Sequence, residues 1–224
     1  MNNAENFQYL LKAGTELSRH RIAETELPWR KYRTPYRIFL AEMLLVRTRT
    51  DVVADHFEKI ASKYPTLEAL AFADENELRE VLRPLGLSKR VPYLIKAARY
   101  ICDSHSGEIP TDVESLLKVP GIGTYTATAI VTFAHGQGLV PADVNILRFV
   151  SRFTGLDMGH MTKGSKELRN LLPILSESKV GLSAENLLDF TRLICKSRKP
   201  KCDVCPLSEH CSYFKKHAPG DETV

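Results

Sequence analysis

Four of the five cysteines fall in the last thirty residues, with the spacing Cys195-x6-Cys202-x2-Cys205-x5-Cys211. Thiolates this close in sequence can surround one metal centre, either zinc or a [4Fe–4S] cluster. Zinc sites often combine two C-x2-C pairs, and this sequence has only one. The uneven spacing therefore favours the iron–sulfur cluster. The remaining cysteine, Cys102, falls on an apolar helix face and is expected to be a core thiol.

A second pattern is a proline followed by two glycines within residues 116–127, LLKVPGIGTYTA. Gly121 and Gly123 permit a tight turn between two helices. The unpaired amides that begin the next helix can hold a phosphate. The segment predicts a helix–hairpin–helix motif, which binds the DNA backbone without reading its sequence. A plain pair of helices with a glycine turn is the alternative.

Two carboxylates stand out by their surroundings. Asp143 precedes an apolar helical segment, which is a common position for a helix N-cap. Glu42 is the only acid in residues 27–50, a stretch that also carries Arg30, Lys31, Arg33, Arg37, Arg47 and Arg49. This charge pattern fits a polyanion-binding surface with one special carboxylate in it. An ordinary solvent-facing glutamate is the alternative for Glu42.

The elements that must position these residues are helices. Apolar residues recur with helical periodicity nearly everywhere, and sustained strand-like alternation is rare. The sequence therefore predicts an all-α fold. Boundaries between domains are expected in the loop Gly136–Gly138 and near Glu26–Pro28. The expected helices cover 4–22, 35–48, 50–62, 74–82, 88–104, 112–118, 123–135, 143–153, 164–176 and 183–195.

Composition and charge exclude several classes of protein. The 224 residues are 43% hydrophobic and 26% charged, which argues against a mainly disordered chain. A net charge of +4 does not by itself identify a partner. No apolar run reaches the ~18–20 residues of a membrane span, and the N-terminus lacks signal-peptide features. We therefore expect no membrane association and a cytoplasmic protein, bound to the nucleoid in a prokaryote. Clustered cysteines in such a chain indicate a metal site rather than disulfides.

Together, the glycine hairpin, an aspartate eighteen residues after Tyr125 and the cysteine spacing resemble the helix–hairpin–helix DNA glycosylases of the endonuclease III superfamily. The resemblance covers roughly residues 27–213. It implies a six-helix barrel with the hairpin over 27–136, and an iron–sulfur domain built from 1–26 and 137–224. The cluster would be a [4Fe–4S] cluster bound by the four late cysteines. The implied partner is double-stranded DNA with a mismatched base, bound by a monomer.

The resemblance also assigns chemistry. It places the essential aspartate at Asp143, whose carboxylate would stabilise positive charge on the deoxyribose as the base leaves. Tyr125 stands where bifunctional members carry a lysine that forms a Schiff base. Because a phenol cannot form that imine, the chain is expected to release the base by hydrolysis alone. Gly121, Gly123 and Thr124 would contact the DNA backbone.

Glu42 and the segment Leu27-Pro28-Trp29-Arg30 resemble two branches, the adenine-DNA glycosylases and the mismatch-specific thymine-DNA glycosylases. In both, this glutamate faces the flipped base. The neighbouring Val46–Arg49 and Gly86–Ser88 depart from the adenine-specific pattern. Tyr125 and Leu85–Ser88 look more like the thymine branch. By resemblance, Arg47 and Leu87 would insert near the vacated base. A phosphate contact for Arg47 and a core position for Leu87 are the alternatives.

The sequence thus predicts a DNA N-glycosylase that removes a mispaired thymine or uracil opposite guanine, without strong lyase activity. Removal of adenine opposite guanine or oxidised guanine is the second candidate. A non-catalytic iron–sulfur DNA-binding protein and a zinc-binding structural protein belong to other classes. The presence of both Asp143 and Glu42 argues against the non-catalytic alternative.

Overall fold

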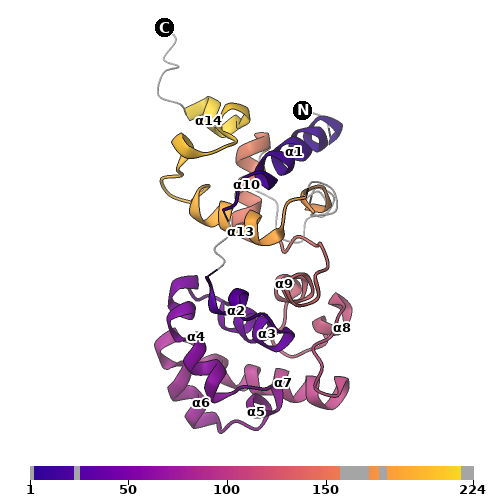
Figure 1. The fold of residues 1–224 in the computed structure, drawn as a ribbon, viewed down its shortest axis with the longest axis vertical. Coiled ribbons are helices and arrows are strands. Elements are labelled where there is room, and N and C mark those ends of the chain that lie inside the picture. The colour runs from indigo at the N-terminus through magenta and orange to yellow at the C-terminus, as the bar shows by residue number, and fades with distance from the viewer. Residues whose placement is uncertain (1–2, 23–25, 157–171, 177–180, 218–224) are drawn as a thin grey trace. The chain divides into compact units, whose positions relative to one another are not determined.

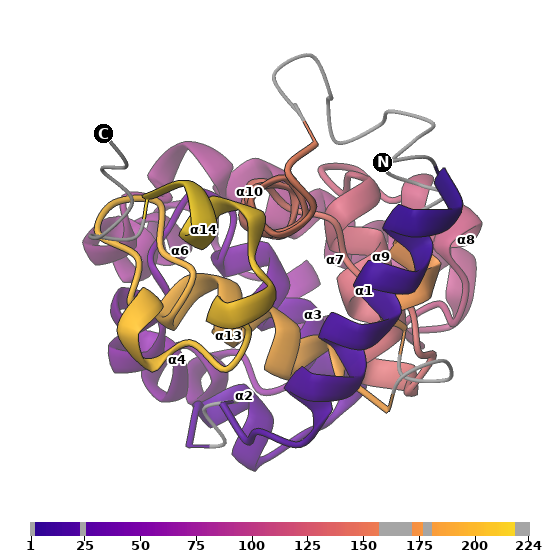
Figure 2. The same cartoon turned by 90° about the horizontal axis from the view of Figure 1, so that it is seen from above.

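The computed structural model describes residues 3–22, 26–156, 172–176 and 181–217. All regular elements in these ranges are helices (Figures 1 and 2), so the prediction of an all-α fold is confirmed. None of the described helices has the length and apolar character needed to span a bilayer. The chain divides into two compact units, with Met1–Glu24 and Gly138–Val224 forming unit 1 and Thr25–Gln137 forming unit 2.

Unit 2 is a continuous stretch of chain. Its α-helices are α2 (Pro28–Lys31), α3 (Pro35–Leu44), α4 (Thr50–Lys63), α5 (Leu67–Ala71), α6 (Glu75–Leu82), α7 (Val91–His105), α8 (Val113–Leu117) and α9 (Thr124–His135). Two short 3-10 helices, η1 (Arg83–Leu85) and η2 (Ser88–Arg90), join α6 to α7. The helices pack mainly as the pairs α5 with α7 and α3 with α9.

Local sequence explains where several of these helices begin. The side chains of Thr34, Thr66, Asp74 and Asp112 each accept a hydrogen bond from a backbone N–H in the first turn of the helix that follows. Such caps satisfy amides that a helix start leaves unpaired. Proline in the first turn favours the same positions in α2, α3 and α7, because its fixed φ suits a helix start.

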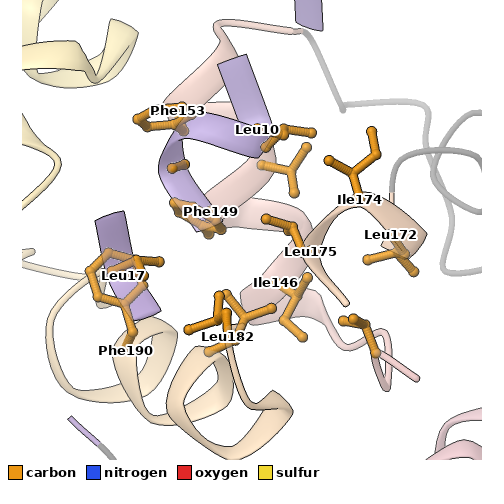
Figure 3. Close-up of a cluster of buried hydrophobic side chains, with 14 of the residues drawn as sticks. Leu10, Leu17, Ile146, Phe149, Phe153, Leu172, Ile174, Leu175, Leu182 and Phe190 are labelled. Atoms are coloured by element: carbon orange, nitrogen blue, oxygen red, sulfur yellow. The ribbon is translucent and has the colours of Figure 1, made fainter. Parts of the chain in front are cut away.

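Unit 1 is assembled from both ends of the chain. Its helices are α1 (Asn3–Ser18), α10 (Val144–Thr154), η3 (Leu172–Leu175), α13 (Ala184–Leu193), η4 (Cys202–Val204), η5 (Ser208–His210) and α14 (Ser212–His217). Figure 3 shows Leu10 and Leu17 from α1 packed among side chains of α10, η3 and α13, including Phe149 and Phe190. One apolar core therefore joins segments from opposite ends of the sequence.

A polar contact reinforces the docking of α1. The buried side chain of Asn186 donates from Nδ2 to the carbonyls of Leu17 and His20, at 3.1 and 2.7 Å. Its Oδ1 accepts a hydrogen bond of 2.7 Å from the backbone N–H of Ile22. Asn186 thereby ties the last turn of α1 and the residues that follow it to α13.

Candidate functional site

The helix–hairpin–helix segment lies in unit 2, where α8 and α9 pack against each other. Gly121 has φ of +82°, a conformation that glycine adopts without strain. A Cβ added there would lie 3.2 Å from Cβ of Tyr93, so the turn also passes close to α7. Gly123 is different: its backbone is extended, and an added Cβ would meet nothing within 4 Å.

The start of α9 has the properties of an anion site. Gly123 occupies the N-cap position, so no side chain covers the first amides of the helix. The first turn contains no acidic residue. Unpaired amides and the helix dipole both favour a negative charge at such an end. Thr124 and Tyr125 begin the helix beside this end, and Tyr125 is partly buried.

Glu42 lies on α3, the helix that packs against α9. Its residue exposure is only 6%, whereas a glutamate on a solvent-facing helix surface would be well exposed. The solvent-facing alternative is therefore wrong for this structure. Burying a carboxylate carries a desolvation cost, and buried carboxylates are common at functional sites.

Arg47 and Leu87 adopt contrasting environments in unit 2. Arg47 is exposed and has φ of +63°, which is uncommon for a residue with a Cβ. Leu87 is 4% exposed and follows the left-handed Gly86, so in this structure it is part of the core. Insertion of Leu87 into DNA would require its side chain to leave that core.

Asp143 lies in unit 1 as the N-cap of α10. Its Oδ1 accepts hydrogen bonds of 2.8 Å from the backbone N–H groups of Asn145 and Ile146. Its Oδ2 accepts a 2.6 Å hydrogen bond from Nδ2 of Asn145. The capping role expected from sequence is thus present. A carboxylate can accept about four hydrogen bonds, so these three fix its orientation and leave Oδ2 able to accept another.

The same unit links Asp143 to the first of the late cysteines. Arg148 donates from Nη1 to Oδ1 of Asn145 at 2.7 Å, and from Nη2 to the carbonyl of Thr191 at 2.8 Å. Its Nε and Nη2 donate to the carbonyl of Cys195 at 3.1 and 2.7 Å. Burial lowers the pKa of Arg148, but an arginine remains protonated at neutral pH. Its guanidinium joins the start of α10 to the cysteine-bearing loop.

The four late cysteines line one cavity, together with the aromatic rings of Phe149, Phe153, Phe190, Tyr213 and Phe214. None of the four forms a disulfide. Burial raises the pKa of the Cys205 thiol to about 11, against a smaller opposing effect of the backbone N–H of Leu207. Burial likewise raises the pKa of Cys202 and Cys211. Bound metal ions would reverse this, because their positive charge stabilises thiolates.

Arg152 closes one side of this cavity. Its Nη1 lies 3.7 Å from Sγ of Cys195 and donates to the carbonyl of Lys196 at 2.6 Å. Its guanidinium also lies 4.6 Å from the ring centroid of Tyr213. Within the described ranges, no three His, Cys, Asp or Glu residues are grouped so that they could hold a single metal ion.

The structure therefore groups the expected site residues in two sets. Glu42, Tyr125, the hairpin, Arg47 and Leu87 belong to unit 2, whereas Asp143 and the cysteines belong to unit 1. Asn145, Arg148 and Arg152 were missed from sequence. Their spacing places them on one side of α10, so a polar stripe on an otherwise apolar helix was the available signal.

Two segments of the chain match known protein families. Residues 40–173 match the HhH-GPD superfamily base excision DNA repair proteins, and residues 195–211 match the iron-sulfur binding domain of endonuclease III. A thymine/uracil-DNA glycosylase of Methanothermobacter thermautotrophicus is 31% identical over 96% of this chain and 99% of its own length. A thymine-DNA glycosylase of Aeropyrum pernix is 33% identical over 92% of this chain and 98% of its own.

A solved structure matches this chain along nearly its whole length. A thermostable thymine-DNA glycosylase matches with a TM-score of 0.84 and 28% identity, over 95% of this chain and 98% of the other. The match to the endonuclease III domain shows that the cysteine segment is an iron–sulfur binding domain. The family match covers more than half of the chain. The chain therefore belongs to the HhH-GPD superfamily of base excision DNA repair proteins.

Proposed function

We propose that this chain is a monofunctional DNA glycosylase that hydrolyses the N-glycosidic bond of thymine or uracil mispaired with guanine in duplex DNA. The observation that carries the proposal is similarity along nearly the whole length to glycosylases named for thymine, at 31% and 33% identity. The buried Glu42 and the absence of a lysine at position 125 support it.

Asp143 has the chemistry that the bond cleavage requires. Departure of the base builds positive charge on the deoxyribose, and a nearby carboxylate stabilises that charge. The three hydrogen bonds that hold Asp143 keep its carboxylate in one orientation, so little reorganisation is needed during the reaction. The free acceptor capacity of Oδ2 can face the sugar or the attacking water.

Glu42 and Tyr125 have the character of a base pocket. A base removed from duplex DNA must leave the stack, and a pocket then reads its edge by hydrogen bonds. Glu42 is a buried carboxylate that can accept or donate a proton at such an edge. Tyr125, on the neighbouring helix, adds a ring and a hydroxyl. Without an amine at this position, no imine forms with the opened sugar.

The cysteine cavity fits a [4Fe–4S] cluster. Cys195, Cys202, Cys205 and Cys211 are its expected ligands, and the surrounding aromatic rings would shield it from water. Such a cluster supplies folding free energy to the segment that binds it. The backbone N–H groups of Leu207, Tyr213 and Phe214 lower the pKa of Cys205 and Cys211 against the larger effect of burial, which favours the thiolate form that a ligand needs.

The remaining assignments follow from the same family membership. Unit 2 is proposed to be the six-helix barrel and unit 1 the iron–sulfur domain, with the hairpin residues Gly121, Gly123 and Thr124 on the DNA backbone. Arg47 and Leu87 would act at the site that the flipped base vacates. The enzyme is proposed to act as a monomer in the compartment that holds the DNA.

The test uses labelled duplexes containing T/G, U/G, T/A and A/G pairs, treated with alkali after incubation. Thymine and uracil opposite guanine should be released, because unpairing a mismatched base costs less than unpairing thymine from adenine. Asp143→Asn should retain duplex binding and lose base release by about 100-fold or more. Near-normal single-turnover release by this variant would refute the assignment of Asp143.

Adenine release is the second candidate function, supported by a Mycolicibacterium smegmatis adenine DNA glycosylase that is 30% identical over 88% of this chain and 67% of its own length. Faster release of adenine than of thymine would favour this function and refute the thymine proposal. Release of no base from any duplex, with tight duplex binding, would favour the non-catalytic alternative.

A further inference from the structure

Arg90, the last residue of η2, has one edge of its guanidinium without a hydrogen-bond partner among the described residues. Its Nε and Nη2 are both shielded from solvent, and neither makes a hydrogen bond in the part of the chain that the structure describes. These two nitrogens form the edge that binds two oxygens of a phosphate side by side. Buried donors nearly always have partners in folded proteins, so this edge indicates a binding function.

The charges around Arg90 favour an anion. Burial, followed by the positive charge of Arg47, lowers the pKa of Arg90. Tyr93 is the other titratable side chain whose charge affects the pKa of Arg90, and no carboxylate is among these neighbours within the described part of the chain. Arg47 also has a strained backbone, with φ of +63°. Such strain persists where the surrounding structure fixes a residue for binding.

The starts of two helices are close to Arg90 along the chain or through the contact of Tyr93 with Gly121. Arg90 directly precedes α7, whose N-terminus has no side-chain cap and no acidic residue in its first turn. Tyr93, in that first turn, lies against Gly121 of the hairpin. α9, which has no side-chain cap, begins three residues after Gly121. Arg47, Arg90 and the starts of α7 and α9 therefore form one positively polarised region within unit 2.

We propose that Arg90, with Arg47 beside it, binds one phosphate of the DNA backbone at a site separate from the hairpin turn. The proposal rests on the proposed function for its ligand, duplex DNA. Arg47 and Tyr93, whose charges act on Arg90, are both exposed, so their side chains can move without disturbing the core. The bidentate edge of Arg90 would hold the strand beside the segment that carries Leu87.

The experiment measures binding of an undamaged duplex and of a T/G duplex across a range of salt concentrations. Arg90→Gln should weaken both about tenfold or more near 0.1 M salt. It should also reduce the slope of log affinity against log salt by about 0.9, the value for one phosphate contact. Arg90→Lys should keep the slope but lose affinity, because an ammonium lacks the bidentate edge.

Arg83→Gln is the matched control. Arg83 is in the same unit, its side chain is 74% exposed, and it pairs with Glu80 on the surface. This variant removes the same charge and should leave affinity within about twofold and the slope unchanged. If Arg90→Gln is folded, as judged by its thermal midpoint, and keeps the wild-type slope, the proposal is overturned.

Two further outcomes are decisive. A loss confined to the T/G duplex would mean that Arg90 reads a base, which also overturns the phosphate assignment. If Arg90→Gln does not fold, Arg90→Lys with wild-type affinity for both duplexes overturns it. Because binding is measured without base release, a wild-type protein that binds but releases no base would refute the proposed function and leave this inference standing.

Discussion

Replacing Arg148 by methionine tests the connection between Asp143 and the cysteine loop. Methionine keeps a long flexible side chain but removes the charge and all donors. The change deprives the carbonyls of Thr191 and Cys195 of their guanidinium partner. It also frees Asn145, whose amide otherwise bridges Arg148 and Asp143.

The magnitude follows from these contacts. Four hydrogen bonds from one charged group to three acceptors are lost, and a net value of about 1.5–3 kcal/mol applies to each such bond in isolation. Because Arg148 is only partly buried and the bonds share one side chain, they are not additive. We expect a loss of about 3–5 kcal/mol in the free energy of unfolding. This corresponds to a fall in Tm of roughly 6–20 °C for a chain of this size.

Thermal unfolding and iron content per chain are the assays, with Arg19→Met as control. Arg19 directly follows α1 in the same unit, its side chain is 70% exposed, and it pairs with Glu16 on the surface. The control should change stability by less than about 0.5 kcal/mol. Base release is then compared between preparations of equal iron content, and should be slower for Arg148→Met because Asn145 no longer fixes Asp143. A variant that matches Arg19→Met in Tm, iron content and base release would refute the reasoning.

Three further predictions concern the other site residues. Cys205→Ser should remove the iron–sulfur absorbance near ~400 nm and lower the Tm, because the cluster stabilises its own segment; retention of stoichiometric iron and full stability would contradict the ligand set. Wild-type products should show strand breaks only after alkali or heat, since Tyr125 offers no amine, and borohydride trapping of the protein on DNA would contradict this. Gly121→Ala should lower stability by about 1–2 kcal/mol, because its φ of +82° is unfavourable for alanine. Gly123→Ala, where a Cβ meets nothing within 4 Å, should keep the wild-type Tm and weaken DNA binding; equal loss of Tm in both variants would count against this difference.

Helix positions were largely predictable from the sequence. The structure confirms helices at nearly the expected positions for α3, α4, α6, α8, α9, α10 and α13. The expected helix 164–176 lies mostly outside the described residues, and its last part is the 3-10 helix η3. The short helices α2, α5 and α14 were not predicted, because four to six residues are too few to show a helical period. The expected helix 88–104 begins later, as α7, because η2 occupies Ser88–Arg90.

The site was less predictable than the fold. Cysteine spacing and the hairpin glycines are local patterns, so the sequence displays them directly. The burial of Glu42 depends on tertiary packing of α3, which the sequence does not display. The contacts of Arg148 join residues 43 and 47 positions apart, and no local pattern reveals them. The binding edge of Arg90 can be recognised only in the structure, where its Nε and Nη2 are shielded from solvent and have no hydrogen-bond partner among the described residues.

The bridge from Asn186 to the end of α1 has a consequence for synthesis on the ribosome. Asn186 contacts residues 164 to 169 positions earlier in the chain, and the core of unit 1 spans the same interval. Because translation proceeds from the N-terminus, α1 emerges long before its partners, whereas unit 2 is complete once residue 137 has left the exit tunnel. Unit 2 can therefore fold first. The apolar face of α1 stays uncovered until the last third of the chain, which supplies its packing partners, has been synthesised. Nascent chains stalled before α13 would expose that face, and there the growing polypeptide is most in need of a chaperone.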